Sequence, residues 1–220
     1  MRREVELTKE QKKAYEQMKK EALMILRDEV YTTQTVLTQL MRLQQVVAGS
    51  LRSPSGELVL LPNNRIKETL SVLEEVSGKA IIFAVFQTDI EALTKAIAEV
   101  YGEDSVASYY GKTPNGERER ILEDFQDKNS PLRFFVSNPH TGGRGLTLTE
   151  ASYMIFYCNS YDLELRIQAE DRIHRIGQDK SCTYIDLVCP GTIDEKILEA
   201  LKKKVSISNE VLGEVKKWFE

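Results

Sequence analysis

The sequence is poor in the residues that form disulfides and metal sites. It contains three cysteines and two histidines among 220 residues. A disulfide framework needs paired cysteines, and a zinc site needs ligands at short, regular spacing. Cys158, Cys182 and Cys189 form no close pair, and His140 and His174 lie far apart in the chain. We therefore predict a protein of a reducing compartment that binds no metal through its own side chains.

Long apolar runs are also absent. The longest, "AIIFAVF" at 80–86, is far shorter than the roughly 20 residues that span a bilayer. The N-terminal "MRREVELTKEQ" is too polar for a signal peptide. The net charge of −4 means that nucleic-acid binding would need a local basic patch. Nuclear-type basic clusters are absent and the length is compact, which favours a bacterial or phage source. We expect an intracellular protein with no membrane partner, in the cytoplasm of a bacterium or phage-infected cell.

Glycine-rich phosphate loops are missing as well. The stretch "YYGKTPNG" at 109–116 has a Gly-Lys pair, but the glycine that a phosphate loop requires five residues earlier is replaced by Val106. Pro114 then follows the threonine directly. The sequence also has no glycine-rich dinucleotide fingerprint. The chain is therefore not expected to hold a triphosphate by the usual cradle.

What is present is an alternation of apolar strands and helical patterns from Asn64 onward. We predict five strands, at 79–86, 105–110, 132–137, 153–157 and 182–188. The first is apolar on both faces, as in a parallel strand covered on two sides. This order predicts a parallel sheet wound on both faces, with ligands beyond the carboxyl ends of its strands. The loops expected there are 87–89, 111–114, 138–147 and 158–162.

Helix starts are marked by threonines that precede Gln or Glu by three residues. These predicted capping boxes are Thr8 with Gln11, Thr88 with Glu91, and Thr192 with Glu195. Apolar residues at helical spacing predict the inward face of a helix after Asn64. They are Ile66, Leu70, Leu73 and Val76.

The domain organisation follows from these patterns. We predict a helical extension at 1–50 with one or two helices, and a linker at 51–64 that can hold a short hairpin. The main lobe is expected at 65–205 and a C-terminal helix at 206–220. A basic face of the first helix suits either DNA or a partner, or is simply solvated; it carries Lys12, Lys13, Lys19 and Lys20.

The stretch "QAEDRIHRIGQ" at 168–178 is the sharpest local motif. If it is helical, Gln168, Arg172 and Arg175 fall within about 60° of one another on one face. The two arginines then either hold an anion or form a salt-bridge ladder with Glu170 and Asp171. A neighbouring stripe would anchor the helix on the sheet; it consists of Leu165, Ala169, Ile173 and Ile176.

A glycine-rich turn precedes this motif. In "SNPHTGGRGLTLTEAS" at 137–152, three glycines follow an apolar strand and permit close backbone approach, which suits phosphate or ribose. The alternative is an ordinary turn with capping threonines. The three glycines are Gly142, Gly143 and Gly145.

Taken in order, these motifs resemble the second RecA-like lobe of helicase superfamily two, most closely that of SWI/SNF-type DNA translocases. "YYGKTPNGERERILEDF" is similar to a segment that carries Gly111, Thr113, Arg118 and Phe125. "TGGRGLTLTEA" and "QAEDRIHRIGQ" resemble the fifth and sixth motifs, and "GTIDEKILEALKKK" the helix that follows. The resemblance implies a RecA-like, P-loop-NTPase-like three-layer α/β/α fold, with a doubly wound parallel sheet and an N-terminal helical extension.

The resemblance also implies how ATP is used. In this family the N-terminal RecA-like lobe of the same protein supplies the phosphate loop and the carboxylates that hold magnesium. By the resemblance, Arg172 and Arg175 are arginine fingers for ATP, Gln168 is their polar partner, and Gly143 and Gly145 lie beside the nucleotide. This chain alone would then hydrolyse essentially no ATP.

Double-stranded DNA is the second implied partner. By the resemblance, its phosphates meet Asn138, His140, Thr141, Gly142, Gln87 and Lys112. Pro139 and His140 depart from the family pattern of a hydroxyl and a basic residue, and Thr147 stands where asparagine is common. Two alternatives stay open, a free-standing interaction module without ATPase duty and an RNA helicase lobe. "RIGQ" and "GTIDEK" favour the DNA translocase.

Overall fold

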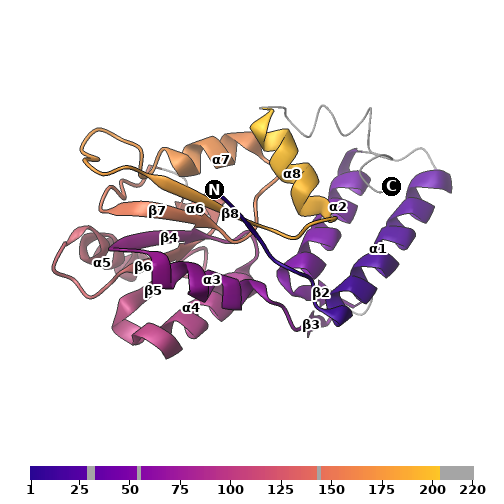
Figure 1. Cartoon of the computed structure of the whole chain (residues 1–220), viewed down its shortest axis with the longest axis horizontal. Coiled ribbons are helices and arrows are strands. Elements are labelled where there is room, and N and C mark those ends of the chain that lie inside the picture. Colours follow the sequence, from indigo (N-terminus) through magenta and orange to yellow (C-terminus); the bar gives the residue numbers. More distant parts are fainter. Residues whose placement is uncertain (29–32, 54–55, 143–144, 204–220) are drawn as a thin grey trace. The chain divides into compact units, whose positions relative to one another are not determined.

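The computed structural model describes residues 1–28, 33–53, 56–142 and 145–203. These residues belong to two compact units (Figure 1). Among the described residues, the sheet unit comprises those within 1–3, 65–160 and 164–187, and the helical unit those within 4–64, 161–163 and 188–203. The predicted helix at 206–220 lies outside the described residues.

This division differs from the predicted domain boundaries in two places. Residues 1–3 belong to the sheet unit, although the first fifty residues were expected to be helical. Residues after Leu187 belong to the helical unit, although the main lobe was expected to run to residue 205. Backbone pairing explains the first difference, because the Asp186 N–H donates to the Met1 carbonyl. This pairing joins β1 to the sheet without an apolar sequence pattern that could have predicted a strand.

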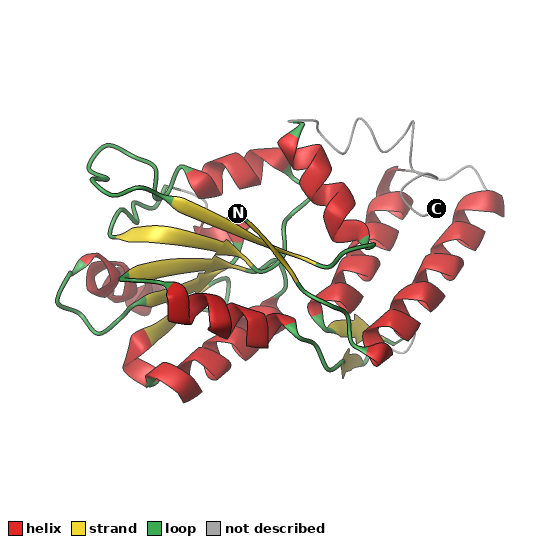
Figure 2. Ribbon diagram, in the orientation of Figure 1, coloured by secondary structure: helices red, strands yellow, loops and turns green. Residues whose placement is uncertain are grey.

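The sheet unit is built on six strands in the order β1-β8-β7-β4-β6-β5 (Figure 2). The five strands from β4 to β8 pair in parallel, which confirms the predicted fold class. The strands are β1 (Arg2–Glu4), β4 (Lys79–Phe83), β5 (Val106–Tyr109), β6 (Phe134–Ser137), β7 (Ala151–Phe156) and β8 (Thr183–Val188).

Helices cover both faces of this sheet (Figure 2). Phe134 packs on Tyr101 of α4 with ring centroids 4.9 Å apart, and Phe135 packs on Phe125 of α5 at 5.2 Å. Consecutive strand residues point to opposite faces, so α4 and α5 lie on opposite sides. The helices of this unit are α3 (Arg65–Glu75), α4 (Gln87–Tyr101), η1 (Glu103–Ser105), α5 (Asn115–Gln126), α6 (Pro139–Gly142) and α7 (Leu163–Glu170).

The inward face of α3 carries an arginine that the apolar pattern did not predict. Arg65 is only 1% exposed, whereas the expected core residues Ile66 and Leu70 are half-buried. The Arg65 guanidinium donates to the carbonyls of Tyr157 and, at 3.3 Å, Leu187. It thereby ties α3 to the ends of β7 and β8.

A buried carboxyl group accompanies Arg65. Asp89, in the first turn of α4, is 5% exposed, and the Cys158 thiol donates to it at 4.0 Å. Burial raises the pKa of Asp89 to about 8, and the charge of Arg65 opposes this rise. The pair is thus electrostatically coupled in the core of the sheet unit.

The predicted capping boxes have different outcomes. The box of Thr8 and Gln11 is confirmed, with reciprocal hydrogen bonds of 3.1 and 3.2 Å. Thr192 caps its helix through the Asp194 N–H, whereas Glu195 accepts from Gly191. The Thr88 box is wrong, because the N-cap of α4 is Phe86 and makes no side-chain bond.

The helical unit contains three helices and a two-stranded hairpin within the described residues. Gln11 of α1 donates to the carbonyls of Val46 and Val47, and the Tyr15 hydroxyl accepts from the Ile193 N–H at 2.8 Å. The hairpin confirms the turn predicted in the linker. The elements are α1 (Lys9–Asp28), α2 (Thr33–Ala48), β2 (Ser50–Arg52), β3 (Leu58–Leu60) and α8 (Ile193–Lys202).

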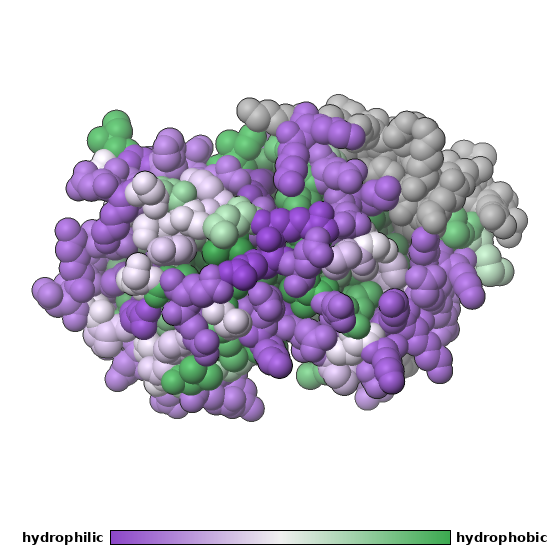
Figure 3. All heavy atoms as spheres, viewed as in Figure 1, coloured by the Kyte–Doolittle hydropathy of each residue, from purple (hydrophilic) through white to green (hydrophobic). Residues whose placement is uncertain are grey.

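The surface is mainly hydrophilic on the face that Figure 3 shows. Large exposed apolar side chains are scattered, and Ile176 is the most exposed of them at 104%. None of the described helices combines the length and apolarity that a membrane span requires.

Candidate functional site

The two arginines of the sharpest motif lie in a turn and not on a helix. The helix α7 ends at Glu170, so the helical face expected for Gln168, Arg172 and Arg175 is wrong in detail. The two guanidinium groups nevertheless converge on one backbone atom. Nη1 of Arg172 donates to the Leu146 carbonyl at 3.1 Å, and Nη1 of Arg175 reaches the same oxygen at 3.5 Å.

No carboxylate of the described residues forms an ion pair with either arginine. Glu170, one partner of the alternative salt-bridge ladder, bonds to Arg166 at 2.6 Å instead. Burial lowers the pKa of Arg172, the charge of Arg175 lowers it further, and Asp171 opposes both effects. Two like charges are therefore held together, with no carboxylate of the described residues in an ion pair with them and only Asp171 acting on Arg172 from a distance.

The surroundings fix the position of this pair. Nε of Arg172 donates to the Gln168 carbonyl at 2.8 Å, and Nη1 of Arg175 donates to the Thr147 hydroxyl at 2.9 Å. Gln178 donates to the Thr149 and Ala151 carbonyls at 2.9 Å each. The turn is thus bound to the segment that leads into β7.

The arginine pair lies at the amino ends of β7 and β8. The expectation that its site would be at the carboxyl ends of the strands is wrong for this pair. The anchoring stripe also needs correction, because Leu165, Ala169 and Ile173 are buried but Ile176 is fully exposed. The helix period breaks at Glu170, and the following turn carries Ile176 away from the core.

The remaining candidates for the nucleotide site are only partly described. Gly145 has a positive φ of 72°, which a side chain would strain. Gly142 is the last residue of α6, and Gly143 lies outside the described residues. The Gln168 side chain donates to Glu164 at 3.0 Å, so its link to Arg172 runs through its backbone carbonyl.

A second set of candidates does lie at the carboxyl ends of neighbouring strands. Gln87 follows β4, Lys112 follows β5, and 138–142 follows β6, which lies between the other two strands. The sheet therefore gathers these residues along one edge. His140 is exposed, and Thr141 is half-buried.

Within this set, Asn138 organises the start of α6. Its side-chain oxygen accepts from the His140 and Thr141 N–H groups at 2.9 and 3.2 Å, and its amide donates to the Val85 carbonyl at 3.3 Å. Asn138 thus holds the backbone of His140 and Thr141 in place at the start of α6.

Gln87 and Lys112 converge on Glu91. Gln87 donates to the Glu91 carboxylate at 2.7 Å, Tyr110 at 3.0 Å and Lys112 at 3.2 Å. These hydrogen bonds, that of Gln87 first, lower the pKa of Glu91. The cation of Lys112 is therefore already partly neutralised in this structure.

The residues of the predicted segment after β5 build its turn. The Thr113 hydroxyl donates to the Ser108 carbonyl at 3.1 Å. Arg118 donates to the Thr113 and Tyr110 carbonyls at 3.0 and 3.1 Å, and Phe125 is completely buried. These motif positions stabilise the fold and fix the location of Lys112.

Comparisons with known proteins show the family of this chain. Residues 63–177, more than half of the chain, match the family model of the helicase conserved C-terminal domain. The chain belongs to this family. The chromatin-remodeling ATPase INO80 of Homo sapiens is 32% identical over 164 residues, which are 74% of this chain and 10% of the relative.

Solved structures place this helicase C-terminal domain among SWI/SNF-type lobes. The Sulfolobus solfataricus SWI2/SNF2 ATPase core in complex with dsDNA matches 99% of the chain and 46% of its own length, with a TM-score of 0.75 and 25% identity. The C-terminal part of the Fun30 ATPase domain matches 99% of the chain and 94% of its own length, with a TM-score of 0.72. At 18% identity, this second match shows the fold alone. The chain spans about a tenth of the length of the first curated relatives.

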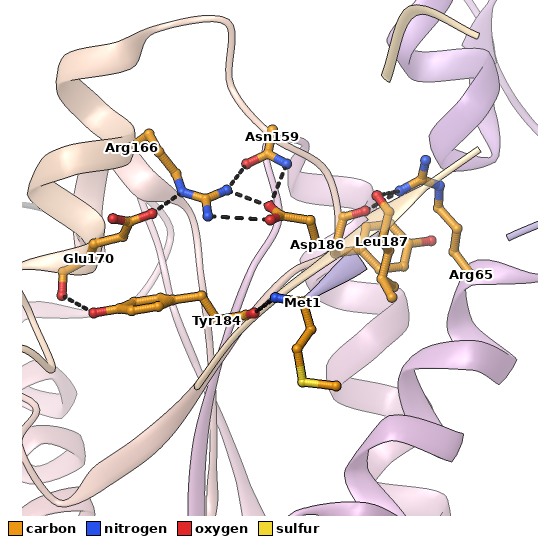
Figure 4. A network of polar contacts seen from close by, with 9 residues as sticks. Met1, Arg65, Asn159, Arg166, Glu170, Tyr184, Asp186 and Leu187 are labelled. Carbon is orange, nitrogen blue, oxygen red and sulfur yellow. Dashed lines mark hydrogen bonds and ion pairs between the residues drawn. The ribbon is translucent and has the colours of Figure 1, made fainter. Parts of the chain in front are cut away.

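Four residues of this helicase C-terminal domain were missed by the sequence analysis. Arg166, Asn159 and Asp186 form a polar network, and Arg65 is a buried anchor of α3 (Figure 4). A signal for part of the network exists, because Asp186 interrupts the otherwise apolar end of β8, "IDLV". A carboxylate in a buried strand requires a cation nearby.

Proposed function

We propose that this chain is the second motor lobe of an ATP-dependent translocase on double-stranded DNA. The observation that carries the proposal is the pair of guanidinium groups at the Leu146 carbonyl, with which no described carboxylate forms an ion pair. Two cations held this close repel each other, and an anion between them would reverse the sign of that interaction. A triphosphate suits the planar fork of each arginine.

ATP would be bound mainly by a first lobe that carries the phosphate loop and holds magnesium. Arg172 and Arg175 would act as arginine fingers on the charge that develops in phosphoryl transfer. Gly145 and Gln168 would support the pair from the backbone, and the sequence also assigns Gly143 to this group.

Double-stranded DNA would bind at the other edge of the sheet. His140, Thr141 and Gly142 follow β6, and Gln87 and Lys112 follow the strands beside it, β4 and β5. Contacts of this kind hold the phosphate backbone without reading the base sequence. The segment 138–150 joins the two sites, because Asn138 stands at its start and Leu146 and Thr147 hold the arginines. Movement of this segment would couple ATP turnover to DNA.

The chain alone is expected to show no ATP hydrolysis above background, with or without duplex DNA. Turnover should appear when a first lobe is supplied, either in trans or within the longer parent protein. Steady-state phosphate release measures both conditions. DNA-stimulated hydrolysis by these 220 residues alone would contradict the assignment of the phosphate loop to another lobe.

Binding of duplex DNA should weaken when Lys112 is replaced by alanine. We expect a loss of a few-fold that is similar for all sequences, and a slope of log Kd against log salt that falls by about one. Lys95→Ala is the matched control, because Lys95 is also an exposed lysine of this unit that pairs with a glutamate, Glu99 at 3.9 Å. Equal effects of the two substitutions would remove Lys112 from the DNA site.

Two competing functions can be tested against the proposed one. A free-standing interaction module would bind nucleic acid but give no turnover with any first lobe. An RNA helicase lobe would be stimulated more by RNA than by duplex DNA. Comparing phosphate release with the two nucleic acids separates these functions from the proposed one.

A further inference from the structure

The guanidinium group of Arg166 ties α7 to the sheet (Figure 4). Arg166 precedes the pair of Arg172 and Arg175 in the sequence. The side chain of Arg166 is only 12% exposed and pairs with Asp186 of β8, which is 10% exposed. Nη1 of Arg166 lies 2.5 Å from the Asp186 carboxylate, and Nη2 lies 3.5 Å from its second oxygen. The guanidinium carbon is 3.5 Å from the centroid of the Phe156 ring.

The same guanidinium has two further partners. Nη1 donates to the Asn159 side-chain oxygen at 2.5 Å, and Nε bonds to Glu170 at 2.6 Å. Asn159 in turn donates to Asp186 at 2.9 Å. One side chain therefore joins α7, the segment after β7, and the strand β8.

Stability alone does not account for this arrangement. A buried ion pair contributes little net stability, because desolvation offsets the attraction, and an apolar pair of similar volume often serves as well. The ion pair of Arg166 and Asp186 instead fixes the orientation of α7 on the sheet. Leu165 and Ala169 of α7 are also buried, and Ala169 belongs to the core cluster that contains Met154 and Phe156 of β7, but apolar burial is non-directional. A forked guanidinium fixes both the rotation and the height of the helix.

The end of α7 sets the position of Arg172. Glu170, the last residue of the helix, accepts the N–H groups of Ile173 and His174 through its carbonyl oxygen, and the Tyr184 hydroxyl reaches the same atom at 3.5 Å. The Arg172 N–H donates to the Ala169 carbonyl. A shift of α7 would therefore carry Arg172 with it.

We propose that Arg166, through Asp186, is a positioning residue that fixes the end of α7 and thereby the aim of Arg172 at the anion. Arg166 itself is buried and its guanidinium is occupied by protein groups, so it does not touch the anion. This inference rests on the proposed function for its effect on turnover, whereas its effect on α7 can be measured without ATP.

The test uses the protein with both lobes and the variants Arg166→Met, Asp186→Leu and the double variant. Arg166→Met leaves Asp186 without its cation, and Asp186→Leu leaves Arg166 with Glu170 as its remaining carboxylate, so each single variant should lose both stability and turnover. The double variant should recover most of the thermal stability. Its kcat should stay about 10- to 100-fold low with a small change in KM for ATP, as expected for misplaced groups. Arg166→Lys, which keeps the charge but loses the fork, should retain stability and lose part of kcat.

Arg133→Met is the matched control. Arg133 is a half-buried arginine of the same unit that stacks on Phe134 at 4.9 Å and donates to the carbonyls of Val76 and Gly78 at 3.2 Å each. It should lose stability without a specific loss of kcat. A double variant with restored stability and wild-type kcat would overturn the positioning role.

Hydrogen exchange on the 220-residue chain gives the readout that is independent of ATP. In the double variant, amides in 163–178 should exchange faster, and amides of α5 and β6 should be unchanged. If Arg172→Ala keeps full turnover, the proposed function is wrong. The positioning role of Arg166 is then tested only by hydrogen exchange in the double variant. Unchanged exchange in 163–178 would then reject it.

Discussion

Arg172→Ala and Arg175→Ala are each expected to lower the kcat for ATP hydrolysis of the two-lobe protein by about 10³-fold or more, the range known for arginine fingers. The physical reason is the loss of a forked cation at oxygens that gain charge only in the transition state. The KM for ATP should change less, because the first lobe supplies most of the ground-state binding. Single-turnover phosphate release at saturating ATP and DNA measures the effect.

Three further variants sharpen this prediction. Arg175→Lys keeps the charge but not the fork, so its turnover should lie between wild type and Arg175→Ala. The double alanine variant should be hardly worse than either single one, because groups that act as a unit are not additive. Arg120→Ala is the control, since Arg120 is an 83% exposed arginine of the same unit that pairs with Asp124. Wild-type turnover of both single variants would contradict the assignment.

The proposed anion site can also be tested on the 220-residue chain without a first lobe, because the two arginines repel each other when no anion is bound. An anion that bridges them should bind the 220 residues weakly and stabilise the sheet unit, and Arg172→Ala should abolish this effect. Inorganic pyrophosphate is a suitable probe, with its effect on the thermal midpoint as the measurement. Because Arg172 is half-buried and Arg175 is exposed, the two contributions need not be equal.

The fold was predictable because its signals are local and repeated. "KAIIFAVF" is apolar on both faces, and such strands separated by helices leave few alternatives to a parallel, doubly wound sheet. Gly102, with a φ of 93°, ends α4 as glycine does at many helix ends. Errors arose where backbone pairing or one buried charge replaced the apolar pattern, as at β1 and Arg65.

The pairing of the two candidate arginines was predictable from the sequence, but its geometry was not. The spacing of Arg172 and Arg175 suggested a pair, and they do meet, but through a turn after Glu170 and a shared carbonyl of Leu146. Periodicity cannot reveal where a helix stops when no proline or glycine marks the end. Nor can it reveal a long-range clamp such as that of Arg166 on Asp186, because its partners lie 20 residues apart.

Replacing Arg65 with methionine is expected to lower the free energy of unfolding by about 3–5 kcal/mol, because two buried carbonyls lose a charged hydrogen-bond donor. The carbonyls of Tyr157 and Leu187 lose this donor, and Asp89 loses the cation that opposes the rise of its pKa. Urea denaturation measures the change. Lys67→Met on the exposed face of the same helix is the control and should change the free energy by less than about 0.5 kcal/mol.

The pH dependence separates the contribution of Asp89 from that of the lost hydrogen bonds. The pKa of Asp89 is about 8 in the folded chain, above the value of about 4 for an unfolded aspartate. The folded state therefore keeps a proton that the unfolded state has released. Asp89 thus contributes stability that is fully present below pH 4 and is lost as the pH rises to about 8. Asp89→Asn should remove this slope and recover part of the stability that Arg65→Met loses at pH 8. If Arg65→Met costs the same with aspartate or asparagine at position 89, the two side chains are not coupled, and the loss comes from the two carbonyls alone.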